Sequence, residues 1–249
     1  MNADITYKPV DAMQQRLTQI FFQWGEKTLV DQTIFPIISY NDKKNPKVIA
    51  TGFFISKKGF FITAKHILRN EDLENLFILY KDREHEVIQI QVANIFTKEK
   101  SDIAIGFLPS SKWAGSNEDI IFSPIKLSFE SPKKGSQIIS VGYTDRGSDK
   151  DNIKVKRDVY QGFLAEYFEG GTGKLDGKMW WTSLPIYGAN SGGPVCAVPN
   201  IGVFAISSTS YDCMEDLSFI SPVSDIFDIP IKIKNKILSI KDIASEQFI

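Results

Sequence analysis

The chain has 249 residues, 43% of them hydrophobic and 24% charged, a composition that fits a folded globular protein and excludes a disordered or fibrous one. Its 29 basic and 30 acidic residues leave a formal net charge of −1, so no global attraction to nucleic acid or to an anionic membrane is expected. No window approaches the roughly 18 apolar residues that a membrane-spanning helix needs.

Residues 1–27 lack the charged start and the apolar stretch of a signal peptide, so we expect a cytoplasmic protein unless a targeting segment has been removed. The cysteines, Cys196 and Cys213, are too few for a disulfide framework; they could pair, but the sequence favours unpaired buried thiols. Two cysteines and two histidines at wide spacing match no zinc motif. We therefore expect neither a metal nor another cofactor.

An amphipathic helix is predicted near the N-terminus. Between residues 11 and 27, apolar side chains recur at steps of three and four: Met13, Leu17, Ile20, Phe21 and Trp24. We assign this helix to an N-terminal extension, residues 1–30. It is expected to pack on the body of the protein, and binding of a regulatory partner through it stays open.

Strand signals replace the helical pattern from residue 34 onward. Short runs of β-branched and aromatic residues are separated by Gly, Pro, Asn and Asp. Lys57-Lys58-Gly59 predicts a hairpin turn in which Gly59 takes a positive φ. About a dozen strands at this spacing are typical of an antiparallel sandwich or of barrels. We expect strands at residues 34–40, 52–56, 60–64, 77–80, 87–95, 103–108, 137–143, 159–167, 180–184, 201–207 and 217–220.

The sequence after Pro222 predicts one more helix. Val223, Ile226 and Phe227 are spaced for a helical face, which Pro230 interrupts. Residues 230–249 are too few for a further domain, and we expect them to form a tail.

Three segments carry the side chains with catalytic chemistry. Thr63-Ala64-Lys65-His66 ends the predicted hairpin, Asp102-Ile103-Ala104-Ile105 opens a later strand, and Asn190-Ser191-Gly192-Gly193-Pro194 is a glycine-rich loop. Each alone has an ordinary explanation, as a hydrogen-bonded histidine, a turn-forming aspartate or a surface loop. Together they follow the chain order His, Asp, Ser that a serine hydrolase triad of the chymotrypsin type has.

These residue types suit nucleophilic catalysis. The hydroxyl of Ser191 is a poor nucleophile near neutral pH and needs an adjacent base, which the imidazole of His66 supplies because its ordinary pKa lies near working pH. The carboxylate of Asp102 would fix the imidazole tautomer and stabilise the imidazolium that forms. Glycines beside the serine leave the backbone bare, so that N–H groups can approach a developing oxyanion.

With these motifs the sequence resembles the trypsin-like serine peptidase superfamily, and more closely its bacterial branch of HtrA-type and glutamyl endopeptidase-like enzymes. The likeness covers roughly residues 33–229. It implies an all-β fold of two antiparallel six-stranded barrels within a peptidase domain, residues 31–229, with the active site between the barrels. It also implies a serine endopeptidase acting on a protein or peptide substrate, with His66, Asp102 and Ser191 as the catalytic triad.

The sequence departs from the family pattern at three positions. Ala189 stands two residues before the nucleophile, where the family usually has the glycine whose N–H is an oxyanion donor. Our hypothesis is that Ala189 and Ser191 still donate, and a requirement for a bound substrate or partner stays open. Lys65 replaces a small residue, and we expect its side chain to reach solvent. Asn190 replaces the aspartate that pairs with a new N-terminus in trypsin-type zymogens, so we expect no activation of that kind.

Specificity is predicted from residues near the nucleophile. Pro185 occupies the position of the acid that selects Arg or Lys in trypsin-like enzymes, and neither histidine, His66 nor His85, lies on the strand used by glutamate-selective enzymes. We therefore expect a small or medium uncharged P1 side chain. The residues expected to line its pocket are Pro185, Ala205, Ile206, Ser207 and Ser208.

Two other functions stay open. A binding module on an inactive protease fold would keep the architecture without the chemistry, and an esterase would keep the chemistry on another substrate. Gly170-Gly171-Thr172-Gly173-Lys174 resembles a phosphate-binding loop, but Phe168 and Leu175 break the required pattern, which favours a surface loop.

Overall fold

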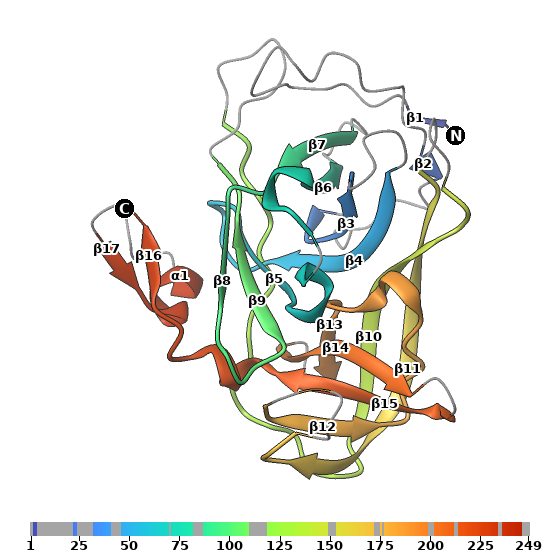
Figure 1. The fold of residues 1–249 in the computed structure, drawn as a ribbon. Coiled ribbons are helices and arrows are strands. Elements are labelled where there is room, and N and C mark those ends of the chain that lie inside the picture. The colour runs from blue at the N-terminus through green and yellow to red at the C-terminus, as the bar shows by residue number, and fades with distance from the viewer. Residues whose placement is uncertain are drawn as a thin grey trace.

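A computed structural model describes most of the chain from residue 32 onward. The described residues are 2–3, 22–23, 32–40, 46–69, 71–81, 87–109, 119–148, 153–171, 175, 177–198, 202–211, 214–233 and 236–245. Antiparallel strands dominate it, as expected from the sequence, and they form two bodies stacked one above the other (Figure 1).

The C-terminal half is a closed six-stranded barrel, as predicted. Its strands are ordered β10 (Gln137–Asp145), β11 (Val155–Phe168), β12 (Met179–Thr182), β15 (Met214–Pro222), β14 (Val203–Tyr211) and β13 (Pro194–Ala197). Alternate residues point inward, so that Ile138, Leu164, Val195 and Ile220 fill the barrel.

The N-terminal half is a curled seven-stranded sheet. Its order is β7 (Val87–Gln91), β6 (Leu76–Lys81), β3 (Ile34–Ser39), β4 (Lys47–Phe54), β5 (Phe60–Ala64), β9 (Ile103–Phe107) and β8 (Asn94–Thr97). The predicted hairpin turn is confirmed between β4 and β5, with Gly59 at φ +88°.

The seventh strand arises because the single predicted strand 87–95 is split. β7 and β8 lie on opposite edges of the sheet, and only Val92 and Ala93 separate them in sequence. The Val92 N–H donates to the carbonyl of Leu76 on one side of the gap, and the Ala93 N–H donates to that of Phe107 on the other. One bent strand thus reaches both edges of the curled sheet, and the predicted chymotrypsin-like architecture of two antiparallel barrels is confirmed.

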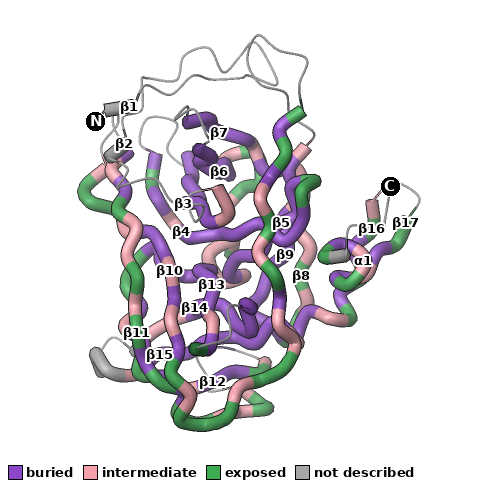
Figure 2. The backbone as a smooth tube through the Cα atoms, turned by 180° about the vertical axis from the view of Figure 1, so that it is seen from behind, coloured by how far each residue is buried: buried purple, intermediate pink, exposed green. Residues whose placement is uncertain are grey.

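Aromatic side chains fill the N-terminal sheet and account for much of the chain's 18 phenylalanines. Phe54 stacks on Phe122 with ring centroids 4.3 Å apart and meets Phe35 at 4.4 Å. A third apolar cluster joins the two halves, because Ile62 of β5, Tyr143 of β10 and Ile206 of β14 belong to it. The buried segments run continuously from one half into the other (Figure 2).

The two ends of the chain differ from the sequence predictions. The N-terminal helix lies outside the described residues, except that Phe22–Gln23 forms a short strand, β2, paired with β1 (Asn2–Ala3). The helix predicted after Pro222 is only a 3-10 turn, η6 (Val223–Ile226). Beyond Pro230, β-branched residues form the hairpin β16 (Ile231–Ile233) and β17 (Lys236–Leu238), which projects from one side (Figure 1).

The C-terminal helix follows that hairpin as α1 (Ile240–Ser245). Its start is a capping box: the Ser239 N–H donates to Asp242 Oδ2 at 2.8 Å, and the Asp242 N–H donates to Ser239 Oγ at 3.2 Å. Ile240 and Ile243 anchor the helix in the apolar cluster shared by both halves. Among the described residues, no helix has the length and apolarity to cross a membrane.

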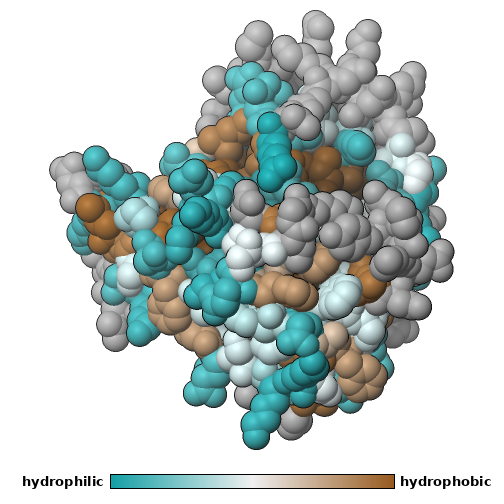
Figure 3. Space-filling view, turned by 60° about the horizontal axis from the view of Figure 1, so that its bottom comes forward, coloured by the Kyte–Doolittle hydropathy of each residue, from teal (hydrophilic) through white to brown (hydrophobic). Residues whose placement is uncertain are grey.

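The visible surface mixes polar and apolar side chains. In a view toward the lower end of the C-terminal barrel, hydrophilic residues are interspersed with small apolar areas (Figure 3). This distribution is ordinary for a folded protein surface.

Candidate active site

The base half of the candidate site is built on two neighbouring strands. Ala64 at the end of β5 pairs with Ile103 at the start of β9, so the residues just outside that pair, Lys65, His66 and Asp102, lie together. The Lys65 N–H donates to the Asp102 carbonyl at 2.7 Å, and the His66 N–H donates to Asp102 Oδ1 at 2.9 Å. His66 Nδ1 lies 2.9 Å from Asp102 Oδ2. A proton on Nδ1 satisfies the buried carboxylate and leaves Nε2 as an acceptor.

Ser191 comes to this pair from the other barrel. Its Oγ lies 3.2 Å from His66 Nε2, and it follows a 3-10 turn, η5 (Gly188–Asn190). The same hydroxyl donates to the Ser208 carbonyl of β14 at 2.7 Å. Because a hydroxyl carries one hydrogen, donation to Ser208 competes with donation to His66. The three predicted catalytic side chains are therefore together, with the serine proton shared between two acceptors.

The glycine after the nucleophile is needed for close packing between the barrels. Gly192 has φ +89°, and a Cβ there would lie 2.2 Å from the Thr51 carbonyl oxygen and 2.4 Å from Thr63 Oγ1. Its N–H donates to the carbonyl of Ser207 at 2.7 Å. Any other residue at this position would push the nucleophile loop away from β4 and β5.

Thr51 ties the nucleophile loop to the N-terminal sheet, a role that the sequence analysis missed. Its N–H donates to the Ser191 carbonyl at 2.9 Å, and its Oγ1 donates to the Ala189 carbonyl at 2.8 Å. The same Oγ1 accepts the Tyr143 N–H of β10 at 2.8 Å. Thr51 is fully buried. A threonine in a strand carries no sequence signal for such a role, because its partners come from the other barrel.

Ala189 lies in η5 and is buried, with its side chain in the apolar cluster between the barrels. Around it, the N–H groups of Asn190, Gly192 and Gly193 each donate to a backbone carbonyl. The N–H groups of Ala189 and Ser191 are the donors expected for an oxyanion. The methyl group of Ala189 fixes this turn against the core, where glycine would have no such anchor.

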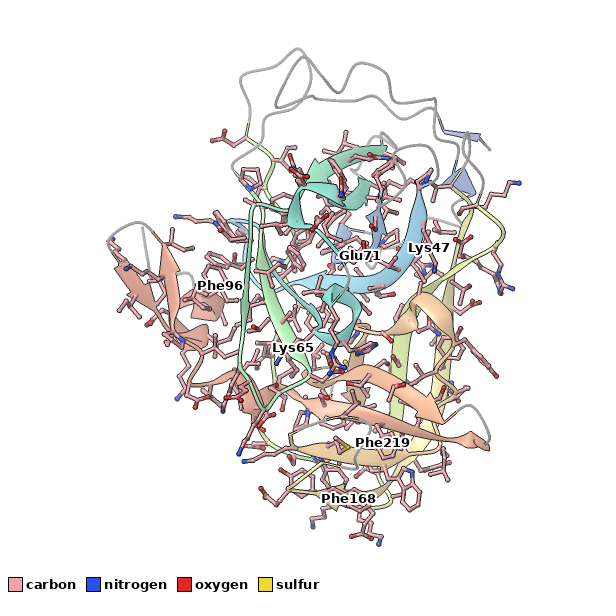
Figure 4. The ribbon with its side chains drawn as sticks, viewed as in Figure 1. Lys47, Lys65, Glu71, Phe96, Phe168 and Phe219 are labelled. Carbon is pink, nitrogen blue, oxygen red and sulfur yellow. The ribbon has the colours of Figure 1, made fainter. Side chains whose placement is uncertain are left out.

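Lys65 is half-buried, and its side chain has partners within the protein. Its Nζ donates to the carbonyls of Lys98 and Glu99, at 2.6 and 2.9 Å, in the loop that leads to Asp102. Figure 4 shows Lys65 near the centre of the molecule, close to β9. The ammonium satisfies carbonyls that end β8, so this lysine links the histidine segment to the aspartate segment twice, through its backbone and its side chain.

The predicted P1 pocket residues lie mostly inside the cores. Ala205 and Ile206 are fully buried in two different apolar clusters. The Ser207 hydroxyl is buried and hydrogen-bonded to Ser140 at 2.8 Å, and that of Ser208 to Ser221 at 2.8 Å. Pro185 is half-buried. Only the Ser208 carbonyl of this set contacts the nucleophile.

The remaining candidates are placed as follows. Among the described residues, no group of three or more His, Cys, Asp or Glu side chains is arranged to hold a metal ion. Burial raises the pKa of the Cys196 thiol to about 11. Cys213, His85 and residues 172–174 of the glycine-rich segment lie outside the described residues.

Comparisons with known proteins bear on the family and the fold. Residues 50–204 match the family model of the trypsin-like peptidase domain. No curated protein sequence matches the chain.

Several solved protease structures share the fold. An inactive form of Rv3671c from M. tuberculosis covers 98% of this chain, and 99% of that chain is covered, with a TM-score of 0.57 at 13% identity. The active form of that protease gives 0.56 at 15%, over 88% of this chain and 90% of that one. The HtrA-type protease AlgW with a tripeptide gives 0.56 at 13%, over 78% of this chain and 58% of that one.

Proposed function

The chain belongs to the trypsin-like peptidase family and is a serine protease, and from this premise we propose that His66, Asp102 and Ser191 are its catalytic triad. One observation carries the proposal. His66 lies between the buried carboxylate of Asp102, at 2.9 Å, and the Ser191 hydroxyl, at 3.2 Å. Those are the distances that a base needs to its orienting group and to its nucleophile.

The proposed reaction is acyl transfer in two steps. Ser191 Oγ attacks the scissile carbonyl while His66 Nε2 takes its proton, and the imidazolium returns that proton to the leaving amine as the C–N bond breaks. Water then attacks the acyl carbon while His66 Nε2 takes a proton from it, and the imidazolium returns that proton to Ser191 Oγ as the ester C–O bond breaks and the acid product leaves. The N–H groups of Ala189 and Ser191 are the proposed donors to the oxyanion in both steps.

The bond from Ser191 to the Ser208 carbonyl suggests how a substrate participates. A peptide N–H that takes the Ser208 carbonyl as its acceptor would compete for it with the Ser191 hydroxyl. The hydroxyl proton would then be free to turn toward His66 Nε2. On this proposal, a bound peptide strand prepares the nucleophile as well as positioning the scissile bond.

We further propose a small or medium uncharged P1 side chain. The half-buried Pro185 stands where a selecting acid would be required for Arg or Lys, and the hydroxyls of Ser207 and Ser208 are already engaged with other serines. An uncharged side chain avoids placing an unpaired charge near these groups.

The test uses a fluorophosphonate probe, which phosphonylates an activated serine. We expect an adduct in the intact mass of the wild type and none in Ser191→Ala. A peptide and an ester with the same acyl group then separate a peptidase from an esterase. Absence of an adduct on folded wild type would instead favour a binding module whose site is silent.

A further inference from the structure

A cleft of about 830 Å³ opens beside the candidate site and is not used by the triad. Its walls come from both halves of the molecule, including Ile49 of β4, Ile67 after the catalytic histidine, and Tyr160 of β11. It extends to Gly188 and Ala189 of η5, the turn that contains a proposed oxyanion donor and is called the oxyanion turn below. Its volume is in the range of sites that bind small molecules or several peptide residues.

The lining places this cleft on the leaving-group side of a bound peptide. Ser191 Oγ lies between His66 Nε2 and the Ser208 carbonyl of β14. Among the described residues, β14 contributes nothing to the cleft, whereas Ile67 follows His66 directly. His66 gives its proton to the departing amine. The part of the substrate peptide that follows the scissile bond therefore extends toward the cleft.

Part of the cleft lining is apolar or aromatic. Ile49 and Ile67 are half-buried, and the rings of Tyr160 and Tyr187 lie with their centroids 5.9 Å apart. Tyr187 is 58% exposed although it adjoins the oxyanion turn. When an apolar side chain of a substrate covers such an exposed aromatic ring, the burial contributes favourable binding free energy.

The two acidic side chains of the lining, Asp145 and Asp158, are engaged with other groups of the protein. Asp158 accepts a hydrogen bond from Thr144 at 2.9 Å and forms ion pairs with Lys156 at 2.6 Å and Arg146 at 3.3 Å. Burial alone would raise the pKa of Asp158, but the bonds from Lys156 and Thr144 outweigh it and lower that pKa. Asp145 is likewise occupied by the N–H groups at the turn after β10. Both carboxylates of the lining are thus occupied by groups of the protein, and the lining also includes the exposed Lys47.

We propose that this cleft binds the peptide segment just after the scissile bond and selects a bulky aliphatic or aromatic side chain at its first position. The inference rests on the proposed function, since it names the substrate class of the same site. Tyr187 is the specificity-determining residue, because its exposed side chain lines the cleft directly before the turn that carries Ala189.

The test compares two quenched peptides with the same acyl side, one with Phe and one with Ala after the scissile bond. We expect wild type to favour the Phe peptide about tenfold in kcat/KM, because a hydrophobic pocket distinguishes side chains by about that factor. Tyr187→Ala should reduce this ratio to about twofold. Phe163→Ala is the control: it removes an aromatic residue of β11 that is 56% exposed, as Tyr187 nearly is, but lies outside the cleft lining, and its ratio should stay at the wild-type value.

Three outcomes would overturn the inference. These are equal wild-type rates on the two peptides, a preference for a charged residue at that position, or a Tyr187→Ala variant that loses both rates equally and keeps the ratio. In each of these the proposed function survives, because the peptides are still cleaved. Wild type that cleaves neither peptide and does not react with the fluorophosphonate would remove the proposed function and the inference together.

Discussion

The two halves of the candidate site are held in different ways. His66 and Asp102 lie at the ends of adjacent strands of one sheet, and two backbone bonds from residues 65 and 66 fix the aspartate. Ser191 lies in a loop whose position depends on the other sheet, through Thr51 and Gly192. Its hydroxyl oxygen also lies closer to the Ser208 carbonyl oxygen, at 2.7 Å, than to His66 Nε2, at 3.2 Å.

This difference indicates where control of the activity can act. Strand pairing within one sheet makes the base half a consequence of folding, and few changes short of unfolding can alter it. The nucleophile half changes whenever the contact between barrels changes. Substitutions at that contact should therefore affect both rate and stability, whereas substitutions beside the base half should affect rate by moving Asp102.

Thr51→Val should have the largest effect. The variant keeps the shape but leaves the Tyr143 N–H and the Ala189 carbonyl without their buried partner. Each unpaired buried group costs about 1–3 kcal/mol, so we expect a loss of about 3 kcal/mol in the free energy of unfolding and a fall of about 30-fold in kcat. Denaturant titration and steady-state kinetics measure the two effects.

Thr51→Ser is the matched control, because it keeps the hydroxyl and removes only a methyl group. It should retain most of the free energy of unfolding and most of kcat. A Thr51→Val variant that is destabilised but turns over normally would break the comparison, since the loop would then hold its geometry without this tie.

Lys65→Met should lower kcat about tenfold with little change in KM. Methionine keeps the unbranched stem, but the hydrogen bonds to the carbonyls of Lys98 and Glu99 are lost, and a charge-assisted bond is worth about 1.5–3 kcal/mol. Lys65 acts here as a positioning residue, through the loop that leads to Asp102. Steady-state kinetics on one peptide gives the split between kcat and KM.

Two variants control this measurement. Lys65→Arg should restore part of kcat, because arginine still donates to carbonyls. Lys134→Met removes an exposed lysine paired with Glu166 and should leave the rate unchanged. Equal kinetics in the Lys65→Met variant and wild type would show that strand pairing alone fixes the aspartate.

Ala189→Gly should raise kcat about threefold while lowering stability by about 1 kcal/mol. The change frees the backbone of the oxyanion turn and removes a methyl group from the cluster between the barrels. Gly188→Ala is its counterpart: Gly188 has φ +21°, which a side chain disfavours, so that variant should be slower. If Ala189→Gly does not raise kcat, the alanine does not restrain the turn.

The sequence predicted what depends on local pattern. Short runs of β-branched and aromatic residues and Gly59 placed the β4–β5 hairpin, with β5 at the expected residues, and the three short motifs named the side chains that the fold brings together. The contacts of Thr51 and of the Ser208 carbonyl could not be predicted, because they form only when the two barrels meet. The split at Val92 has the same origin, since its partners lie on both edges of a sheet.

Asp225→Asn should have the smallest effect and tests whether the base half depends on the C-terminal barrel. Asp225 of η6 is buried, one of its carboxylate oxygens has no hydrogen-bond partner among the described residues, and it contacts Ser101, next to Asp102. Burial raises the pKa of Asp225 despite the hydrogen bond from Ser101 and the nearby Lys98.

The sign of its pH dependence follows. A carboxyl whose pKa is higher in the folded state is destabilising once ionised, so wild type loses stability as pH rises from the unfolded-state pKa through the folded one. Asn does not titrate, and Asp225→Asn should be more stable than wild type by about 1 kcal/mol at pH 7 and equal to it at low pH. Chemical denaturation at both pH values measures this. Its kcat should stay within about twofold of wild type, because strand pairing holds Asp102; a larger loss would mean that the base half, too, is set by contact between the barrels.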